Sequence, residues 1–397
     1  MEKKIGILTV YYKTINYGAM LQAYALVKCL NNMGYSAEQI TYDRFRDSDD
    51  VFEVLDSVGQ PSRISQLLQT IKSNGILYPA KYYFHKKKAF DISVREEIRK
   101  RYRSIERFGN NIPHSAEIYT YDNISNSLAD YDTYVVGSDQ VWSPFLYRRA
   151  FFCDFVGSSE MNCIAYAVSI SQNQLPDKCQ AVYREKLKRF SAISLRENNA
   201  EVIQNLTDTP VEWVVDPTIL LGKEQWDVLA SARVVKDRYV FCYFLSQDSK
   251  ERELASKFAE KKGLKLVTIP YVSGNYTESD FKFGDVRIIS ASPEEWISLI
   301  KYADYIFTDS FHGTAFAHIY HKQFFSFASE KQLSERGIRI RTLLELYGTE
   351  SRFCNLKNEM NVDILLSQPD FNYAETNKAI EKKIKDSYDY LKNNLKQ

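Results

Sequence analysis

The start of the chain alternates between strand and helix patterns, and this alternation restricts the fold more than any other feature of the sequence. Continuous Ile, Leu and Val between Lys4 and Tyr11 predict a buried strand. A helix is expected from about Gly18 to Met33, because its apolar residues recur at helical spacing, and Gly34 stands where a glycine commonly ends a helix. A second strand is expected over 35–42. Strand, helix and strand in this order predict a parallel α/β domain.

The rest of the chain repeats the alternation. Strands are expected at 133–136, 163–168, 192–195, 212–215, 238–245, 264–269, 286–290, 304–308 and 323–327, and helices at 62–108, 249–262, 293–301, 313–321 and 336–347. A chain of 397 residues is too long for one compact core of ordinary size. The sequence therefore predicts the α/β class, with two Rossmann-like domains facing each other across a cleft at 1–205 and 206–350, and a helical tail at 351–397.

Charge and hydropathy exclude several classes of partner. The 52 basic and 51 acidic residues leave a formal charge of +1, which argues against a general electrostatic grip on nucleic acid. The basic section from Lys86 to Arg107 also contains glutamates, so it is interpreted as a solvated helix face. The N-terminus lacks the pattern of a signal peptide, and no apolar stretch reaches the roughly 18 residues needed to span a bilayer. A cytoplasmic protein is expected, with peripheral membrane contact if the substrate is lipid-linked.

The cysteine and histidine spacings predict no metal site. None of the six cysteines forms a CxxC pair, and the five histidines are not interleaved with them, so the cysteines are expected to be reduced and mostly buried. His318 and His321 lie three residues apart, which could place both rings on one helix face. No Asp or Glu accompanies them, so a structural role is the better interpretation.

Polar or glycine-containing segments follow four of the predicted strands. They lie at 16–24, at 136–142, at 194–197 together with 216–218, and at 308–314. Ligands of open α/β sheets bind beyond the carboxyl ends of the strands, so these segments are candidates for a shared site. None is specific alone, because a glycine before a helix is usually a turn and Asp-Pro can simply end a strand.

Taken together, the segments resemble the polysaccharide pyruvyl transferase family. The resemblance rests on Asn-Tyr-Gly-Ala-x-Leu-Gln-Ala-Tyr-Ala-Leu from residue 16, Gly-Ser-Asp-Gln-Val-Trp from 137, Ser-x-Arg-Glu from 194, Asp-Pro-Thr-x-Leu-Leu from 216 and Thr-Asp-Ser-Phe-His-Gly-Thr from 308. It covers about residues 5 to 350. It implies a GT-B-like fold whose C-terminal helix packs back on the first domain. It also implies an enzyme that moves a pyruvyl group from phosphoenolpyruvate onto two hydroxyls of a sugar or lipid-linked oligosaccharide, without a cofactor, in capsule or exopolysaccharide synthesis.

Donor binding and acid catalysis are expected mainly in the second half of the chain, with Arg196 added from the end of the first. Phosphoenolpyruvate carries a carboxylate and a phosphate, which suit the bidentate guanidinium of an arginine and the N-terminus of a helix. His312 is the expected general acid, since imidazole titrates near neutral pH. The donor-binding residues are expected to be Arg196, Ser310, Gly313, Thr314, Arg339 and Arg341.

Acceptor binding is expected in the first half of the chain. The candidates are Asn16, Tyr17, Gly18, Gln22, Asp139, Gln140 and Trp142. Trp142 could stack on a sugar ring, while Asp139 and Gln140 could bind hydroxyls. The opposing interpretation is equally strong, because Gly137 to Asp139 can form a turn stabilised by its own side chains and Trp142 can be a core residue.

One departure from the family pattern weakens the donor assignment. Characterised members often have Arg two residues before the histidine, where this chain has Ser310. A second cation is therefore expected to reach the site, with Arg341 as first choice and Arg339 as second. Two other functions stay open, namely a GT-B glycosyltransferase using a nucleotide sugar, and a non-catalytic sugar- or anion-binding relative.

Overall fold

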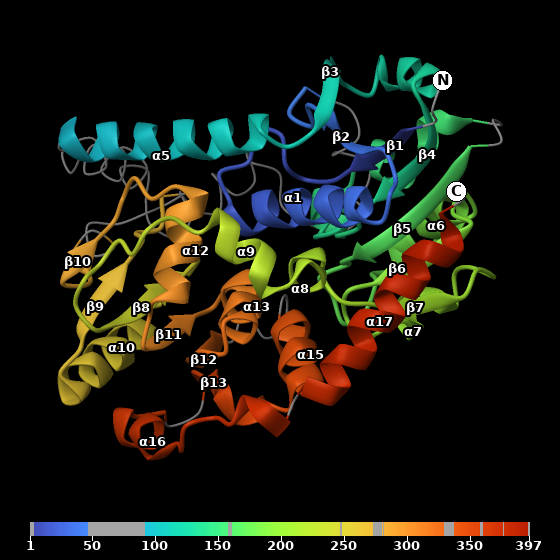
Figure 1. Cartoon of the computed structure of the whole chain (residues 1–397). Coiled ribbons are helices and arrows are strands. Elements are labelled where there is room, and N and C mark those ends of the chain that lie inside the picture. Colours follow the sequence, from blue (N-terminus) through green and yellow to red (C-terminus); the bar gives the residue numbers. More distant parts are fainter. Residues whose placement is uncertain are drawn as a thin grey trace, which may run out of the picture.

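The computed structural model describes residues 4–46, 92–157, 161–246, 248–272, 280, 282–328, 337–357, 360–375 and 377–395. Most of the loop expected at 43–61 and the first part of the helix expected at 62–108 lie outside these residues. The described elements form two parallel sheets, each with helices on its faces (Figure 1). This confirms the predicted α/β class with two Rossmann-like domains.

The first sheet surrounds the strand that opens the chain. Its order is β3 (His114–Tyr119), β2 (Ala37–Tyr42), β1 (Lys4–Leu8), β4 (Tyr131–Val136), β5 (Asn162–Val168), β6 (Ala192–Leu195) and β7 (Val211–Trp213). Its helices are α1 (Tyr17–Asn32), α5 (Ile92–Asn110), α6 (Asp177–Leu187) and α7 (Glu201–Gln204). The strand β3 was not predicted, because it is an edge strand whose side chains are largely exposed and give no apolar run.

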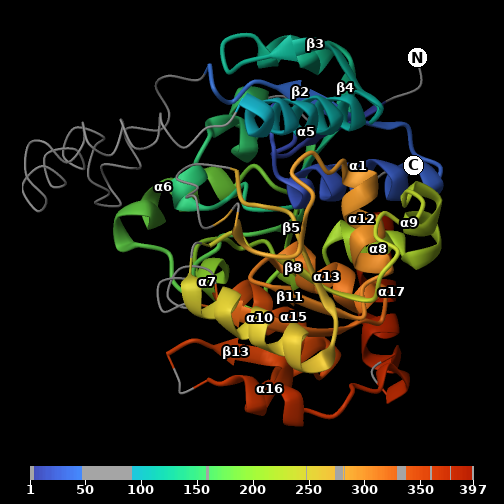
Figure 2. The ribbon, with the colours of Figure 1, turned by 90° about the vertical axis from the view of Figure 1, so that its left-hand side faces the viewer.

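The second sheet has the order β10 (Val286–Arg287), β9 (Lys265–Thr268), β8 (Tyr239–Tyr243), β11 (Tyr305–Thr308), β12 (Gln323–Ala328) and β13 (Phe353–Asn355). Its helices are α10 (Ser249–Lys262), α12 (Pro293–Lys301), α13 (Phe311–Ile319), α15 (Gly337–Tyr347) and α16 (Val362–Ser367). All five residues of β8 are buried, as expected for a central strand covered on both faces. Figure 2 shows β2, β3 and β4 of the first sheet at the opposite end of the molecule from β13 and α16 of the second domain.

Strand order corrects the predicted domain boundaries. The first sheet continues to β7, which lies beyond the boundary expected at residue 205. The second sheet likewise includes β13, which lies inside the expected tail. The strand β7 was expected near 212–215 but was assigned to the second domain, whereas β13 is three residues long and has no apolar run that marks it in the sequence. The connection between the sheets contains α8 (Pro217–Leu221) and α9 (Lys223–Leu229).

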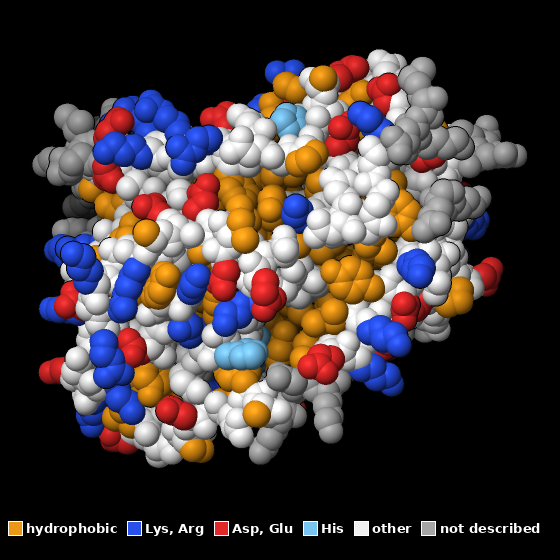
Figure 3. All heavy atoms as spheres, in the orientation of Figure 1, with side chains coloured by type: hydrophobic (Ala, Val, Ile, Leu, Met, Phe, Trp, Pro, Cys, Tyr) orange, Lys and Arg blue, Asp and Glu red, His pale blue; other side chains and the backbone are white. Residues whose placement is uncertain are grey.

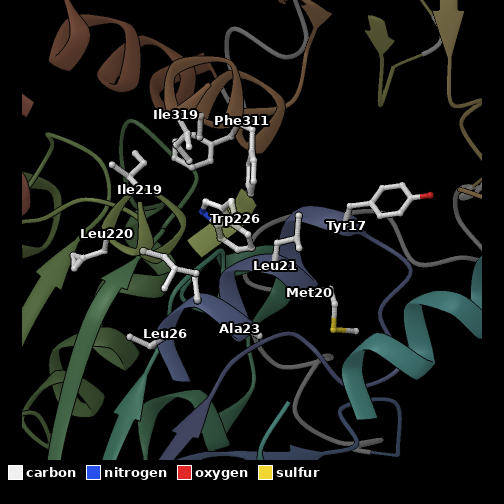
Figure 4. Packing of buried hydrophobic residues seen from close by; sticks show 14 of the residues in the cluster. Tyr17, Met20, Leu21, Ala23, Leu26, Ile219, Leu220, Trp226, Phe311 and Ile319 are labelled. Carbon is white, nitrogen blue, oxygen red and sulfur yellow. The ribbon is translucent and has the colours of Figure 1, made fainter. Parts of the chain in front are cut away.

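A single apolar core joins the two domains. The rings of Tyr17 of α1 and Trp296 of α12 stack with centroids 5.9 Å apart, and those of Trp226 of α9 and Phe316 of α13 lie 4.9 Å apart. Figure 4 shows how α1, α8, α9 and α13 contribute neighbouring side chains to this core. Burial of large aromatic and aliphatic groups here fixes the domains against each other.

The final helix returns to the first domain. From α15, α17 (Asn377–Asn394) runs along the side of β6 and β7 (Figure 1). The Tyr390 hydroxyl donates to the Ala165 carbonyl at 2.9 Å, and the Val215 amide donates to the Ser387 hydroxyl at 3.0 Å. Among the described residues, no helix is long and apolar enough to cross a membrane.

Candidate active site

A pocket opens between the domains where the strand order of each sheet reverses. In the first sheet β1 lies between β2 and β4, and in the second β8 lies between β9 and β11. Connections leave such neighbouring strands on opposite faces, and the space between them commonly binds ligands. The pocket lies at the loops that follow β1, β4, β8 and β11, at the end of β12 and near the start of α15. Its lining residues are Asn16, Asp139, Gln140, Leu245, Asp309, Ser310, Phe311, His312, Phe327, Ala328, Gly337, Arg339 and Ile340.

The N-terminus of α13 forms the centre of the second domain's side. Ser310 is its N-cap, and the Ser310 hydroxyl accepts from the Gly313 amide at 3.3 Å. A Cβ on Gly313 would lie 2.4 Å from the Thr308 hydroxyl oxygen, so glycine lets the helix start directly against β11. The turn presents the side chains of Ser310 and His312 to the pocket.

His312 lies between the two domains. Its side chain is 9% exposed, and its Nε2 lies 3.7 Å from the Asp216 carboxylate oxygen Oδ2. This distance is too long for a hydrogen bond but allows an ion pair when the imidazole is protonated. On the other side of the ring, a Cβ on Gly18 would lie 2.1 Å from Nδ1. The glycine near the start of α1 therefore makes room for the imidazole.

Asp216 lies behind His312 and binds several of the groups around it. Sequence reasoning assigned this residue no role in the site. Asp216 caps α8, with Oδ1 accepting from the Thr218 amide at 3.0 Å. Its Oδ2 accepts from the Ser138 hydroxyl at 3.0 Å and from Arg196 at 2.9 Å. Burial alone would raise the pKa of this carboxyl, but His312, Arg196 and the Thr218 amide together hold it well below its usual range. The Asp216 carboxylate is thus charged next to the imidazole.

The sequence matches one known protein family. A family model described as polysaccharide pyruvyl transferase matches residues 16–331. The chain belongs to the polysaccharide pyruvyl transferase family. A search among curated proteins found no match.

Solved structures of other sugar enzymes share the fold. The S. aureus MnaA structure with UDP has a TM-score of 0.51 and 12% identity, covering 100% of this chain and 98% of that one. The UDP-GlcNAc 2-epimerase from Neisseria meningitidis bound to UDP-GlcNAc has a TM-score of 0.50 and 10% identity, covering 98% and 100%. At such low identity the likeness shows the fold alone, which agrees with the GT-B-like arrangement predicted from the sequence.

Arg196 does not face the pocket of this family member, which corrects its expected role in binding the donor. Its side chain is 1% exposed and pairs with Asp216, with Glu197 at 3.3 Å and with Asp139 at 3.4 Å. Its guanidinium also lies 4.1 Å from the centre of the Phe311 ring. A guanidinium surrounded by three carboxylates and a ring cannot also grip a substrate anion. Arg196 instead holds the Asp216 carboxylate, which lies beside His312.

The pair of arginines proposed to replace the missing one separates in the structure. Arg339 lines the pocket with His312, and it lies near enough to Glu197 to lower the pKa of that carboxyl, which burial otherwise raises. Arg341, the first choice, is exposed and lies over the Phe353 ring at 5.3 Å from its centre. Its place on α15 turns it away from the pocket, so the expectation for Arg341 is corrected.

Gly313 and Thr314 were also expected to bind the donor, but neither residue lines the pocket. The Thr314 hydroxyl is buried, donates to the Ser310 carbonyl at 3.1 Å and lies 2.7 Å from the Ser326 hydroxyl. Gly313 and Thr314 both stabilise the turn that presents His312, so their contribution is structural.

Three residues expected to bind the acceptor are internal. Trp142 is buried, stacks on Phe152 and donates its indole N–H to a backbone carbonyl, so it is a core residue. The Tyr17 hydroxyl donates to the Ala291 carbonyl at 2.6 Å within the domain interface. The Gln22 side chain accepts from the Ser138 amide at 3.2 Å and so supports the 137–142 loop. Polar and aromatic residue types alone could not reveal these inward orientations.

Three of the four remaining acceptor candidates meet at the pocket, whereas Gly18 does not line it and instead makes room for the His312 ring. Asn16 caps α1 by accepting from the Ala19 amide at 3.2 Å, and it lines the pocket with Asp139 and Gln140. Asp139 has a φ of 71°, a conformation that Asp tolerates better than most residues, and it places the carboxylate beside Arg196. The first domain thus contributes a carboxylate and two amides opposite His312.

His318 at the far end of α13 is a core histidine, as interpreted from the sequence. Its ring stacks on that of Tyr347 with centroids 3.9 Å apart. Burial lowers the pKa of His318 to about 3, so the ring is neutral at physiological pH. Within the described part of the chain, no three His, Cys, Asp or Glu side chains are grouped so as to hold a metal ion.

Proposed function

We propose that this protein transfers a pyruvyl group from phosphoenolpyruvate to two hydroxyls of one sugar, forming a cyclic ketal in cytoplasmic synthesis of a surface polysaccharide. The observation that carries the proposal is that His312, at the N-terminus of α13, lies next to the buried Asp216 carboxylate. The buried Asp216 carboxylate lies where it can hold the imidazole in position to deliver a proton to the donor, as a general acid must.

The helix end and Arg339 provide the donor site. The N-terminus of α13 favours an anion beside His312, because its free amides and dipole are directed at the pocket. Arg339 adds a cation on the same wall. The pocket carboxylates already have partners, since Asp139 lies 3.4 Å from Arg196 and Asp309 accepts from the Leu245 amide at 2.6 Å. Arg339 and the N-terminus of α13 then face the anionic groups of the donor, beside His312.

The chemistry then needs one proton donor. His312 protonates the methylene carbon of the enol, which leaves an oxocarbenium-like centre at the neighbouring carbon. The first sugar hydroxyl attacks that centre, the carbon–oxygen bond to phosphate breaks, and the second hydroxyl closes the ring. One of the two hydroxyl protons restores His312 and the other leaves with phosphate. Asn16, Asp139 and Gln140 lie where they can hold the two hydroxyls.

Phosphate release tests this proposal. The full chain is incubated with phosphoenolpyruvate and a panel of mono- and oligosaccharides, and both inorganic phosphate and the mass of the sugar are measured. His312→Asn should lower turnover by roughly two to four orders of magnitude. His321→Asn is the matched control, because His321 is exposed, lies outside the pocket lining and has a φ of 50°, which Asn tolerates.

Thermal melting separates the proposal from the nucleotide-sugar alternative. A ligand that binds the native state stabilises it by about 2.7 kcal/mol at one hundred times its Kd. Phosphoenolpyruvate should raise the melting temperature of the wild type. A rise with UDP-sugars and none with phosphoenolpyruvate would replace the pyruvyl transfer with glycosyl transfer.

A further inference from the structure

A second pocket lies beside the first, on the first domain. It is lined by Tyr11, Tyr12, Lys13, Thr14, Ile15, Met20, Tyr102, Glu106, Gly109 and Asn110. These residues come from the loop after β1, from α1 and from α5. Ile15 lines this pocket and the next residue, Asn16, lines the pocket of His312. Consecutive residues of one loop thus border both pockets.

The wall on α5 presents a ring and two polar groups. Tyr102, Glu106 and Asn110 recur every four residues, so they share one helix face. Tyr102 is 37% exposed, which is unusual for a large ring. Among the described residues, no side chain hydrogen-bonds to Glu106 or Asn110. Their donors and acceptors are therefore available to a ligand.

The opposite wall is held in place by buried groups. The Lys13 ammonium lies 2.6 Å from the buried Asp43 carboxylate and 5.2 Å from the centre of the Tyr12 ring. The Tyr11 hydroxyl lies 2.9 Å from that of Thr41. These contacts fix Tyr12 and Lys13 at the rim before any ligand arrives. A ligand then loses less entropy on binding than it would with a mobile wall.

The floor lies between two helices that approach closely. Met20 projects from α1 on the side of α5 (Figure 4). A Cβ on Gly109 of α5 would lie 2.9 Å from the Met20 methyl carbon, so the absence of a side chain at Gly109 brings α5 down onto α1. The result is an apolar floor with aromatic rings and polar groups around it.

We propose that this second pocket is an acceptor subsite, which binds a sugar unit next to the one that reacts at His312. A pyranose has an apolar C–H face, which suits exposed tyrosine rings and an apolar floor. Its hydroxyls suit the carboxylate, amide and ammonium groups at the rim. The proposal rests on the proposed function and makes it more specific. The acceptor is an oligosaccharide or a growing chain, extending from the His312 pocket along residues 11–16.

Binding measurements test the subsite without relying on catalysis. Affinity is measured by calorimetry on the full-length His312→Asn protein with glucose, galactose and N-acetylhexosamine oligomers of one to four units. Affinity should rise by about tenfold between one and two or three units in at least one series, which corresponds to about 1.4 kcal/mol. Tyr102→Ala should remove this gain, whereas Tyr102→Phe should keep it, because the ring remains.

Arg103→Ala is the matched control, since Arg103 is the exposed neighbour of Tyr102 on α5 and lies outside the pocket lining. It should leave the gain unchanged. An affinity that is independent of oligomer length in every series would overturn the subsite, as would a gain that survives Tyr102→Ala. The subsite would also be overturned if a polyprenyl phosphate bound in this pocket and none of the sugars displaced it.

Oligomer binding and phosphate release, measured together, distinguish this inference from the proposed function. If no acceptor releases phosphate from phosphoenolpyruvate but oligomers still bind through Tyr102, the pyruvyl transfer fails and the sugar subsite stands. If phosphate is released with monosaccharides and oligomers equally, and Tyr102→Ala changes neither rate, the transfer stands and the subsite fails.

Discussion

The N-termini of α1 and α13 meet across the pocket and are built alike. Each follows a strand at the switch point of its sheet, β1 for α1 and β11 for α13, and each is capped by a side chain that accepts from the amide three residues on. Each also has a glycine in its first turn where a Cβ would collide with a neighbour. The two ends nevertheless differ in what they present.

The α13 end exposes a reactive group, whereas the α1 end shapes its surroundings. His312, the second residue of α13, lies in the pocket, whereas the second residue of α1 is Gly18, and Tyr17 before it is buried in the domain interface. Gly18 then leaves room for the imidazole. The comparison teaches that a motif in one domain can be required because of a side chain in the other. Four substitutions test this division between chemistry and shape.

The largest effect is expected at Asp216, which lies behind the α13 end. Asp216→Asn should lower turnover by roughly two to four orders of magnitude, because the carboxylate that orients the His312 ring is lost. Removing one partner of the buried Arg196 pair should cost about 3–5 kcal/mol of stability.

The stability of the wild type also depends on Asp216. Its carboxyl pKa is lowered by folding, so its contribution is complete above the unfolded value of about 3.9 and is lost as the pH falls below that value. The asparagine variant should lack this component of acid unfolding. Asp154→Asn, which breaks the 2.7 Å pair with Lys186 elsewhere in the first domain, is the control and should retain activity. An Asp216→Asn variant with the same turnover as the wild type would contradict the role assigned to Asp216.

The next effect comes from the α1 end. Gly18→Ala should lower turnover by about a hundredfold, because a methyl group would lie 2.1 Å from the imidazole Nδ1 and must displace the ring. Gly34→Ala at the other end of α1 is the matched control. Its φ of 92° makes alanine cost roughly 1 kcal/mol or more, but nothing lies within 4 Å of the new carbon. Equal activities in the two variants would show that Gly18 serves the helix and not the histidine.

A smaller effect separates the two arginines of α15. Arg339→Gln should raise the KM for phosphoenolpyruvate by roughly tenfold or more, because a pocket cation is lost. Arg341→Gln should leave it within about twofold, since an exposed guanidinium over a ring contributes little. The comparison would fail if Arg341→Gln were the more damaging variant.

The smallest effect is expected at Tyr17. Tyr17→Phe removes the hydroxyl that donates to the Ala291 carbonyl and should cost about 1–2 kcal/mol in chemical unfolding. The KM for the acceptor should not change, because the hydroxyl points into the domain interface. A changed acceptor KM at unaltered stability would restore Tyr17 to the acceptor site.

Long apolar runs explain why the fold could be predicted from the sequence. Most of the central strands were located within a few residues, because strands buried on both faces give runs of large apolar side chains. The exposed edge strand β3 and the short β13 give no such run. Helix α6 was also missed, because only three of its residues are described as buried and its sequence is mostly polar.

The site was predicted in outline but not in its internal order. His312, Ser310, Asp139 and Arg339 were expected and line one pocket, because strand ends of both sheets converge there. The orientation of Arg196 could not be predicted, since its partner Asp216 follows a different strand and is itself a helix cap. Residue type shows which side chains can act, whereas packing decides which of them reach the substrate.

The shared apolar core has a consequence for building hybrid enzymes. Tyr17, Trp226, Trp296 and Phe316 come from both halves of the chain and pack into one body. Either half produced alone would expose this surface to water and aggregate. A chimera between family members must therefore exchange α1, α8, α9, α12 and α13 as a matched set, even when only the acceptor preference of one half is wanted.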